Sequence, residues 1–224
     1  MYLRDCHSLP NPRERLAVGG PAILSEAELL AIWLGGGGTH GGAMGLAHGL
    51  LAEFGSLRGV LRAPQERLER QRGIGPARLA QLRVVLELAR RHHREEFLSG
   101  PSLTDPRRAQ DFLRTELRDL DYESFCLIFL DSRYRVTSFE PMFRGTVDSA
   151  QVHPREVVRR ALEVRACAVI LAHNHPSGMA EPSDADHVIT RRLREALELV
   201  DIRVLDHVIV GEGTCVSLAE RGLL

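Results

Sequence analysis

Two short, continuous apolar runs constrain the fold of this chain more than any other feature. Residues 125–131 and 166–173 are each long enough for one strand, and neither run alternates between apolar and polar residues. A strand with this pattern is buried on both faces, as in sheets that helices cover on both sides. The two runs therefore predict a layered α/β fold.

The rest of the second half fits this class. Helices are expected at residues 106–118, 153–165 and 183–199, and strands at 134–144, 202–210 and 214–218. Asp105 suits the N-cap of the first helix, and Pro106 suits its first turn. The region 134–144 is expected to form one or two strands, broken at Pro141, because proline lacks the N–H that a sheet requires.

Residues 1–97 contain helical patterns and no strand pattern. Helices are expected at residues 25–34, 43–54, 64–71 and 76–94. Ser25 and Glu28 form a capping box for the first of them, and the Gly-rich residues 35–42 end it. We therefore assign 1–97 to a small all-α domain, 98–106 to a linker rich in Gly, Pro, Ser and Thr, and 102–224 to the α/β domain.

Candidate metal ligands follow the second apolar run. On an extended chain, residues i and i+2 point to the same side, so His173 and His175 aim both imidazoles at one point. A loop of seven residues then leads to Ser183, which suits the N-cap of a helix, and Asp186 falls in the first turn of that helix. Two imidazoles and one carboxylate leave a fourth position open for water. Catalytic zinc sites have this open position, whereas structural zinc sites are closed by four protein ligands.

Each part of this pattern has a simpler explanation when it is taken alone. A His-x-His pair is common, and the segment from Ser183 to Asp186 is also a capping box. The combination is more specific, because the two histidines end an apolar run and the spacing returns a carboxylate toward them. We therefore favour a metal site over a purely structural role.

The same residues resemble a known family. The pattern H-x-H-P-x(6)-S-x-x-D, from His173 to Asp186, matches the JAMM motif of the JAB/MPN metalloproteases. Segments similar to the RadC-like, UPF0758-type proteins of bacteria are 143–162, 170–178 and 201–213. The resemblance covers essentially the whole chain, although Cys215 stands where an aromatic residue is usual. It implies a cytidine-deaminase-like mixed sheet flanked by helices, preceded by a small helix-hairpin-helix domain.

The resemblance also implies an activity. JAMM proteins are zinc-dependent hydrolases, metallopeptidases or isopeptidases, so His173, His175 and Asp186 are expected to hold one catalytic Zn²⁺. Zinc lowers the pKa of its bound water to about 7 and polarises a carbonyl group. A carboxylate then accepts the proton and passes it to the leaving amine.

Further site residues are assigned through the resemblance. In JAMM proteins the proton-accepting glutamate lies at the start of the first strand, which matches Glu123. Glu140 is the alternative, unless it is a solvated carboxylate at a strand edge. Ser183 resembles the serine that donates to the developing oxyanion, and its N-cap role competes for the same hydroxyl. Asp206 and His207, inside an apolar strand, either orient a metal ligand or are satisfied polar groups of the core.

The first half carries a separate signal. The segment Arg72-Gly73-Ile74-Gly75-Pro76 resembles a helix-hairpin-helix turn, in which a helix N-terminus binds phosphate. Residues 58–94 contain ten Arg and three acidic residues, a net charge of +7, which suits contacts with a phosphate backbone. The simpler explanation is a packing hairpin with an Arg-rich solvated face. The resemblance to RadC-like proteins implies the alternative function, a DNA-associated protein linked to repair or recombination, with non-specific DNA binding by residues 58–94.

Composition limits the remaining classes. The net charge is −1, and all 29 residues counted as Lys or Arg are Arg. The four cysteines are far apart and include no C-x-x-C pair, which argues against a disulfide scaffold. No apolar run approaches membrane-spanning length, and the N-terminus has no signal-peptide core. We expect a cytoplasmic protein with a peptide or protein substrate and no membrane partner.

Overall fold

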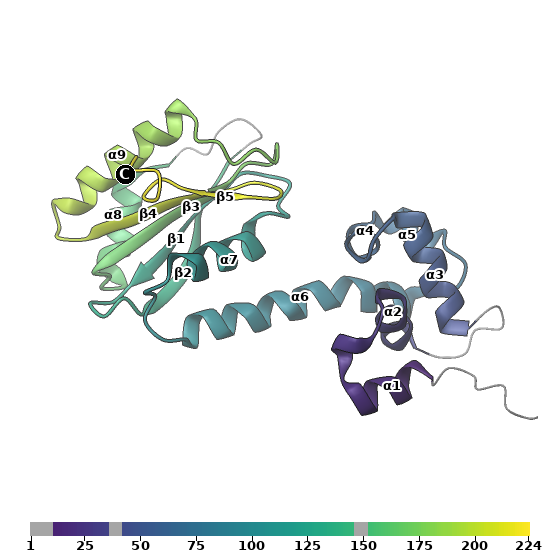
Figure 1. Cartoon of the computed structure of the whole chain (residues 1–224). Helices are drawn as coiled ribbons and strands as arrows, with labels where there is room; N and C mark the ends of the chain where they lie inside the picture. The colour runs from purple at the N-terminus through teal and green to yellow at the C-terminus, as the bar shows by residue number, and fades with distance from the viewer. Residues whose placement is uncertain (1–10, 36–41, 146–151) are drawn as a thin grey trace, which may run out of the picture. The chain divides into compact units, whose positions relative to one another are not determined.

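The computed structural model describes residues 11–35, 42–145 and 152–224 (Figure 1). It divides the chain into two units, Met1–Ala89 and Arg90–Leu224. The first unit is helical, and the second is a mixed sheet with helices on both faces. This arrangement confirms the α/β class and the helical N-terminal region predicted from the sequence. Most of the Gly-rich segment 35–42 lies outside the described residues.

Short helices pack around one apolar core in the first unit. They are α1 (Pro12–Gly19), the 3-10 turn η1 (Pro21–Ile23), α2 (Glu26–Leu34), α3 (Gly42–Phe54), α4 (Leu57–Arg62), α5 (Gln65–Glu69) and the beginning of α6 (Pro76–Ser99). The most buried core residues include Leu50, Val60, Leu68 and Leu82. The sequence analysis missed α1 and α4. The helix α1 buries no residue, and α4 spans fewer than two turns, so neither shows a full apolar period.

One arginine of the helical unit links the end of α2 to the turn before α6. Arg78, in the first turns of α6, donates to the carbonyl oxygens of Leu34 at 3.1 Å and Gly35 at 2.9 Å, at the end of α2. It also donates to the carbonyl oxygen of Gly73 at 2.7 Å. Gly73 has a φ of +96°, a conformation that favours glycine, so the turn before α6 depends on this residue.

In the residues of the second unit that the structure describes, five strands form one sheet, in the order β2-β1-β3-β4-β5. They are β1 (Ser124–Leu130), β2 (Val136–Arg144), β3 (Ala168–Asn174), β4 (Arg203–Val210) and β5 (Cys215–Ser217). β3 and β4 are parallel, and the other neighbours are antiparallel. Every residue of β1 and β3 is buried, as the two apolar runs predicted.

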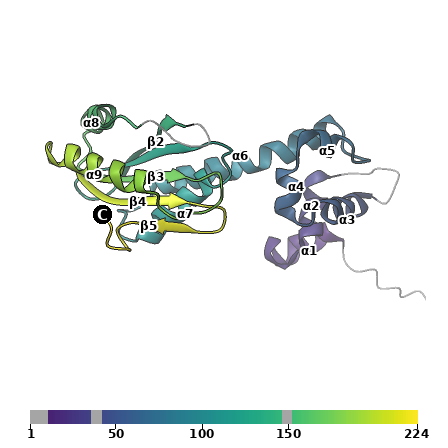
Figure 2. The same cartoon turned by 90° about the horizontal axis from the view of Figure 1, so that it is seen from above.

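Alternate residues of the strands face two separate apolar layers. The helix α7 (Pro106–Leu117) packs on one face, against Ile128 and Leu130. The helices α8 (Pro154–Glu163) and α9 (Asp184–Glu198) cover the opposite face, against Leu127 and Phe129 (Figures 1 and 2). His173 continues the side of β3 that faces α9, so the candidate ligands belong to this second layer.

The strand β2 differs from the expectation. It runs through Pro141 as one strand, although a break was predicted there. The sheet order makes β2 an edge strand, where a missing N–H is tolerated. The pairing register also skips Met142 opposite the step from Phe125 to Cys126, which is the irregularity of a β-bulge.

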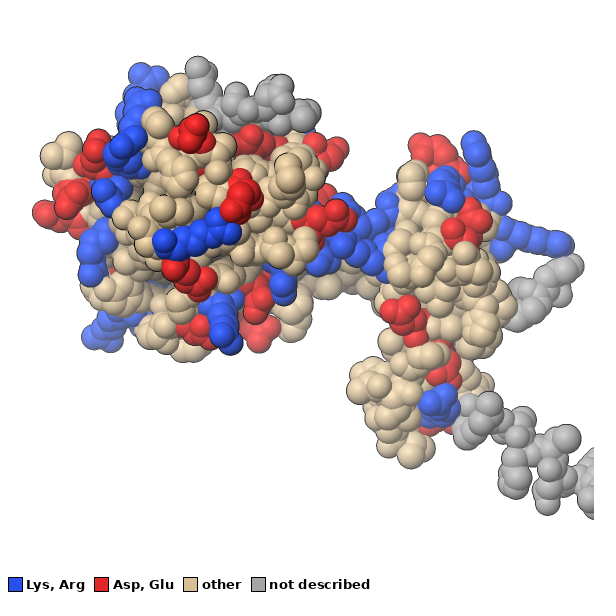
Figure 3. All heavy atoms as spheres, turned by 45° about the horizontal axis from the view of Figure 1, so that its top comes forward, with Lys and Arg blue, Asp and Glu red and all other residues tan. Residues whose placement is uncertain are grey.

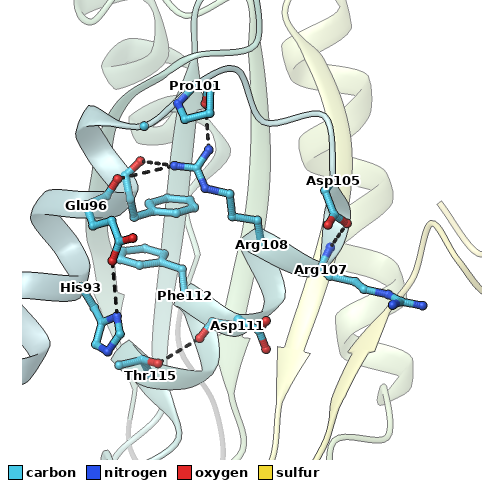
Figure 4. Close-up of a pocket in the computed structure, with 11 residues that line it drawn as sticks. His93, Glu96, Pro101, Asp105, Arg107, Arg108, Asp111, Phe112 and Thr115 are labelled. Carbon is cyan, nitrogen blue, oxygen red and sulfur yellow. Dashed lines mark hydrogen bonds and ion pairs between the residues drawn. The ribbon is translucent and has the colours of Figure 1, made fainter. Parts of the chain in front are cut away.

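An arginine of α7 forms hydrogen bonds with the end of α6 and with the chain that connects α6 to α7. The helix α6 continues five residues beyond its predicted end, and Asp105 caps α7 as predicted. Arg108 donates to the carbonyl oxygen of Pro101 at 2.8 Å (Figure 4). It also donates to the carbonyl oxygen of Phe97 at 3.2 Å, and its guanidinium lies over the Phe97 ring. An open depression of about 660 Å³ lies over these residues.

Among the described helices, none is long and apolar enough to cross a membrane.

The cysteines within the described ranges do not pair with one another. Cys126, Cys167 and Cys215 are free thiols, and Cys6 lies outside the described residues. Burial raises the pKa of Cys126 to about 11. Its thiol therefore stays neutral and packs as a small apolar side chain.

Candidate metal centre

The two candidate histidines lie at the carboxyl end of β3. His173 is only 1% exposed and is the next-to-last residue of the strand. His175 follows the strand, and its backbone N–H donates to the carbonyl oxygen of Val210, the last residue of β4, at 3.0 Å. This bond holds the chain close to β4 after the strand has ended. Both imidazoles are thereby directed to the same side, as the i, i+2 spacing predicted.

The loop after His175 is packed against the turn between β4 and β5. Gly178 donates to the carbonyl oxygen of His175 at 2.9 Å and accepts from the N–H of Glu212 at 2.9 Å. Its φ of +85° favours glycine. A side chain on Gly211 would lie 2.4 Å from the carbonyl oxygen of Gly178, so the two backbones approach each other too closely for one.

The third candidate ligand is fixed by the start of α9. Ser183 is the N-cap of this helix, and its hydroxyl accepts from the N–H of Asp186 at 3.2 Å. The Asp186 carboxylate accepts from the backbone N–H of Ser183 at 2.7 Å and from its hydroxyl at 2.6 Å. This reciprocal capping box holds Asp186, which is 7% exposed, against the ends of the strands.

The ligand atoms of the three residues converge. Nε2 of His173 lies 3.0 Å from Nε2 of His175 and 3.0 Å from one carboxylate oxygen of Asp186. Nε2 of His175 lies 3.6 Å from the other oxygen. Within the ranges that the structure describes, this is the one group of three or more His, Cys, Asp or Glu side chains arranged to hold a metal ion.

The second nitrogen of each imidazole has its own partner. Nδ1 of His175 lies 2.8 Å from the carbonyl oxygen of Met179, which can only accept, so Nδ1 carries the proton. Nδ1 of His173 lies 2.8 Å from Nε2 of His207. Partners of this kind set which ring nitrogen keeps a lone pair for a metal. In the neutral form of His175, that nitrogen is Nε2.

Asp186 and His175 shift each other's pKa. Burial alone would raise the pKa of the Asp186 carboxyl, but hydrogen bonds with His173 and His175 outweigh it and hold that pKa well below its usual range. The hydrogen bond with Asp186 raises the pKa of His175, although its partial burial acts in the opposite direction. Asp186 is therefore a carboxylate at neutral pH, the form that binds a metal.

Glu123 lies next to this cluster. It directly precedes β1, and β1 pairs Phe125 opposite His173, so Glu123 stands at the same end of the sheet as the histidines. Its negative charge contributes to raising the pKa of His175. The side chain of Asn174 accepts from the N–H of Ser124 and donates to the carbonyl oxygen of Tyr122, both at 2.9 Å.

Asn174 therefore holds the backbone on both sides of Glu123. The sequence analysis missed this role, although Asn174 stands between the two histidines. Alternation along β3 turns its side chain away from theirs, and a partner about 50 residues earlier is visible only once the strand pairing is known. Asn174 is only 1% exposed, so these hydrogen bonds are shielded from water.

Glu140 lies in a different environment. It stands on β2, and its two carboxylate oxygens accept from Nε and Nη2 of Arg160 on α8, at 2.7 and 2.8 Å. This fork lowers the pKa of the Glu140 carboxyl. Arg160 also pairs with Glu163 of α8. The carboxylate of Glu140 is thus engaged in joining β2 to α8.

Asp206 and His207 are adjacent in the sequence, but their side chains contact different parts of the sheet unit. His207 is fully buried and contacts His173, as described above. Burial lowers the pKa of His207 well below its ordinary value, and the nearby His173 lowers it further, so the ring is neutral. Asp206 accepts from the hydroxyl of Ser217 at 2.6 Å and from the N–H of Ala219 at 3.0 Å, which fixes β5 and the chain after it.

Comparisons with known proteins place the chain in a family. A family model described as RadC-like JAB domain matches residues 103–223, and one described as UPF0758 N-terminal matches residues 3–80. UPF0758 proteins of Thioalkalivibrio sulfidiphilus and Nitrosococcus oceani are each 55% identical to this chain, over the whole of both sequences. One from Halorhodospira halophila is 52% identical over the same span. These matches confirm the resemblance seen in the sequence. The chain belongs to the UPF0758 family and carries a RadC-like JAB domain.

Proposed function

We propose that this chain is a zinc-dependent hydrolase of the JAMM type, a metallopeptidase or isopeptidase. The observation that supports this most directly is the convergence of Nε2 of His173, Nε2 of His175 and the carboxylate of Asp186. Two ligands at about 2.0–2.1 Å from a tetrahedral zinc ion lie about 3.3 Å apart. The distances of 3.0 to 3.6 Å between the three ligand groups fit that requirement.

The chemistry of the donors also fits. Two imidazoles and one carboxylate are a usual set for catalytic zinc, and they leave one position for a water molecule or a substrate oxygen. A zinc ion held there would supply a Lewis acid that polarises a carbonyl group and makes water more acidic. The remaining groups of the reaction must come from this chain.

We assign the proton transfer to Glu123. A carboxylate in that role accepts a proton from water and donates it to the leaving amine, so it must stand close to the metal ligands without serving as one. Glu123 meets this condition, since its charge acts on His175 and Asn174 holds its backbone. Glu140 meets it less well, because Arg160 binds both of its oxygens.

Ser183 is the proposed donor to the developing oxyanion. Its hydroxyl now donates to Asp186 at 2.6 Å, and its oxygen also caps α9. The hydroxyl must therefore release Asp186 before it can donate to a substrate oxygen. We propose a peptide or an isopeptide as the substrate, because the side chains at the site are compatible with hydrolysis of either kind of amide bond.

The test combines metal content with cleavage. Elemental analysis of the purified chain should find about one zinc ion per chain. We expect His173→Ala to lose it and Glu123→Gln to keep it. A library of peptides and isopeptide-linked peptides should be cleaved by the native chain and by Glu140→Gln but not by Glu123→Gln. A native chain that takes up no zinc contradicts the metal assignment, and equal cleavage by Glu123→Gln contradicts the assignment of the base.

We propose DNA binding by the helical unit as a second candidate function. Residues 58–94 carry ten Arg against three acidic residues, and the turn at Gly73 leads directly into α6. Figure 3 shows basic side chains projecting from the helical unit at the upper right, whereas acidic and basic groups alternate over the sheet unit in this view. Binding of duplex DNA by the full chain should weaken steeply as salt is raised, and reversing the charges of Arg70 and Arg72 should weaken it further. No binding at low salt would remove this candidate.

A further inference from the structure

A row of buried polar side chains lies behind His173, on the side away from the other ligands. Nδ1 of His173 is 2.8 Å from Nε2 of His207, and Nδ1 of His207 is 2.5 Å from the hydroxyl oxygen of Thr190. The Thr190 hydroxyl in turn lies 2.5 Å from the backbone carbonyl oxygen of Asp186. These three side chains are 1%, 0% and 3% exposed, so water does not compete for their hydrogen bonds.

The far end of the row sets the direction of every hydrogen bond in it. The Asp186 carbonyl oxygen can only accept, so the single hydroxyl proton of Thr190 is directed to it. The hydroxyl oxygen must then accept from Nδ1–H of His207. A fully buried imidazole without an acidic partner is neutral, so Nε2 of His207 carries a lone pair. That lone pair accepts from Nδ1–H of His173.

The result is a defined tautomer of His173. In the neutral ring, the form that binds a metal, this proton stays on Nδ1 and the lone pair is on Nε2, the atom that faces His175 and Asp186. The row also begins and ends at the same residue, because Asp186 supplies the carbonyl oxygen at one end and a carboxylate oxygen beside Nε2 at the other. Movement of α9 would therefore disturb both ligands together.

We propose that Thr190 and His207 are positioning residues that set the tautomer of His173 and, through it, the affinity of the His173–His175–Asp186 triad for a divalent metal. The inference rests on the proposed function, because it requires that the triad binds a metal. The two histidines differ in this respect. His175 is oriented by the backbone carbonyl of Met179, whereas His173 is oriented by side chains that substitution can remove.

A purely structural explanation competes with this one. Thr190 and His207 fill space between α9 and β4, and their hydrogen bonds satisfy groups that are buried in any case. Thr190→Val and Thr190→Ser separate the two explanations. Valine keeps the shape of threonine and removes the hydroxyl, whereas serine keeps the hydroxyl and removes a methyl group. If Thr190 acts only by packing, Thr190→Ser should lower the zinc affinity more than Thr190→Val does. If Thr190 is a positioning residue, Thr190→Val should lower the zinc affinity more.

The experiment measures zinc affinity in the full-length chain, by competition with a chromophoric chelator. We expect Thr190→Val to weaken zinc binding about 10- to 100-fold, the usual effect of losing a group that orients a ligand. Thr190→Ser should stay within about threefold of the native chain, since it keeps the hydrogen bond. Thermal unfolding of the zinc-free variants checks that both are folded. Equal affinities for the two variants would overturn the inference.

A second measurement needs no variant. Long-range ¹H–¹⁵N NMR spectra of the zinc-loaded native chain report which ring nitrogen of each histidine carries the proton. We expect His207 to carry it on Nδ1, and a proton on Nε2 of His207 would overturn the inference even if Thr190→Val fails to fold. A native chain that binds no divalent metal overturns both this inference and the proposed function. A native chain that binds zinc with the other tautomer overturns this inference alone.

Discussion

The helical unit and the sheet unit differ in how they bury polar groups. Among the described residues, the helical unit buries one charged side chain, Glu28, which the N-cap Ser25 and Arg15 satisfy. The described part of the sheet unit buries nine polar or charged residues, which are Glu116, Ser124, His173, Asn174, Asp186, Thr190, Asp206, His207 and Ser217. Most of the nine gather around the end of the sheet that holds His173. Apolar packing thus accounts for nearly all of the buried residues of the helical unit, but not for the buried polar residues of the sheet unit.

This difference supports placing the proposed chemistry in the sheet unit. A buried polar group lowers stability unless it is hydrogen-bonded, and an apolar core of the same shape is usually at least as stable. A cluster of them is therefore poorly explained by stability alone. The helical unit uses polar contacts as well, but near its surface, where water can replace them. Removing a hydrogen bond should therefore lower the free energy of unfolding most in the buried interior of the sheet unit and least at the surface.

The largest effect is expected at Asp206. In Asp206→Ala, the hydroxyl of Ser217 and the backbone N–H groups of His207 and Ala219 lose their acceptor in the interior. We expect the free energy of unfolding of the zinc-free protein to fall by about 3 kcal/mol, measured by urea denaturation. Asp206→Asn keeps one acceptor oxygen and should lose about half as much. A loss below about 1 kcal/mol would show that water reaches these donors and would weaken the contrast between the units.

The sequence predicted the elements of the sheet unit better than the contacts of its buried polar groups. Continuous apolar runs predict β1 and β3 because burial on both faces leaves a direct trace in composition. The role of Ser183 as an N-cap was predicted for a similar reason, since capping depends on residues three apart. Pro141 was misjudged because only the strand order shows that β2 is an edge.

The contact of His207 with His173 could not be predicted in this way. The two residues are 34 positions apart and meet because β3 and β4 are parallel neighbours in one particular register. The roles of Thr190 and Asn174 depend in the same way on pairing and helix packing. The candidate ligand set was visible in the sequence because it lies within one short segment, whereas its supporting hydrogen bonds come from β4, α9 and the loop after His175.

An intermediate effect is expected at Arg78 in the helical unit. Arg78→Ala removes the donor shared by the carbonyl oxygens of Leu34, Gly35 and Gly73, but this site is partly exposed and water can replace part of the loss. We expect the free energy of unfolding to fall by about 1–2 kcal/mol in urea denaturation. Arg83→Ala, which removes a single bond to the carbonyl oxygen of Ala63, is the matched control and should cost about 0.5 kcal/mol. A loss for Arg78→Ala as large as that for Asp206→Ala would contradict the ordering by burial.

The smallest effect is expected at Glu140, whose ion pair with Arg160 is partly exposed in the sheet unit. We expect Glu140→Gln to lower the free energy of unfolding by less than about 1 kcal/mol at neutral pH, because solvent screens exposed pairs. Arg160 lowers the pKa of the Glu140 carboxyl from its ordinary value of 4.5. The stabilisation is therefore complete above that ordinary value and is lost as pH falls through the lower pKa of the folded state.

Urea denaturation across pH tests this sign directly. The difference between the native chain and Glu140→Gln should be constant from about pH 6 to pH 8 and should shrink below about pH 4.5. Glu181→Gln, which breaks the more exposed pair with Arg221, serves as the control and should show no measurable difference at any pH. A difference for Glu140→Gln that persists in acid would mean that Glu140 acts through packing rather than through its charge. The surface of the sheet unit would then resemble its interior, and burial alone would no longer explain the contrast between the two units.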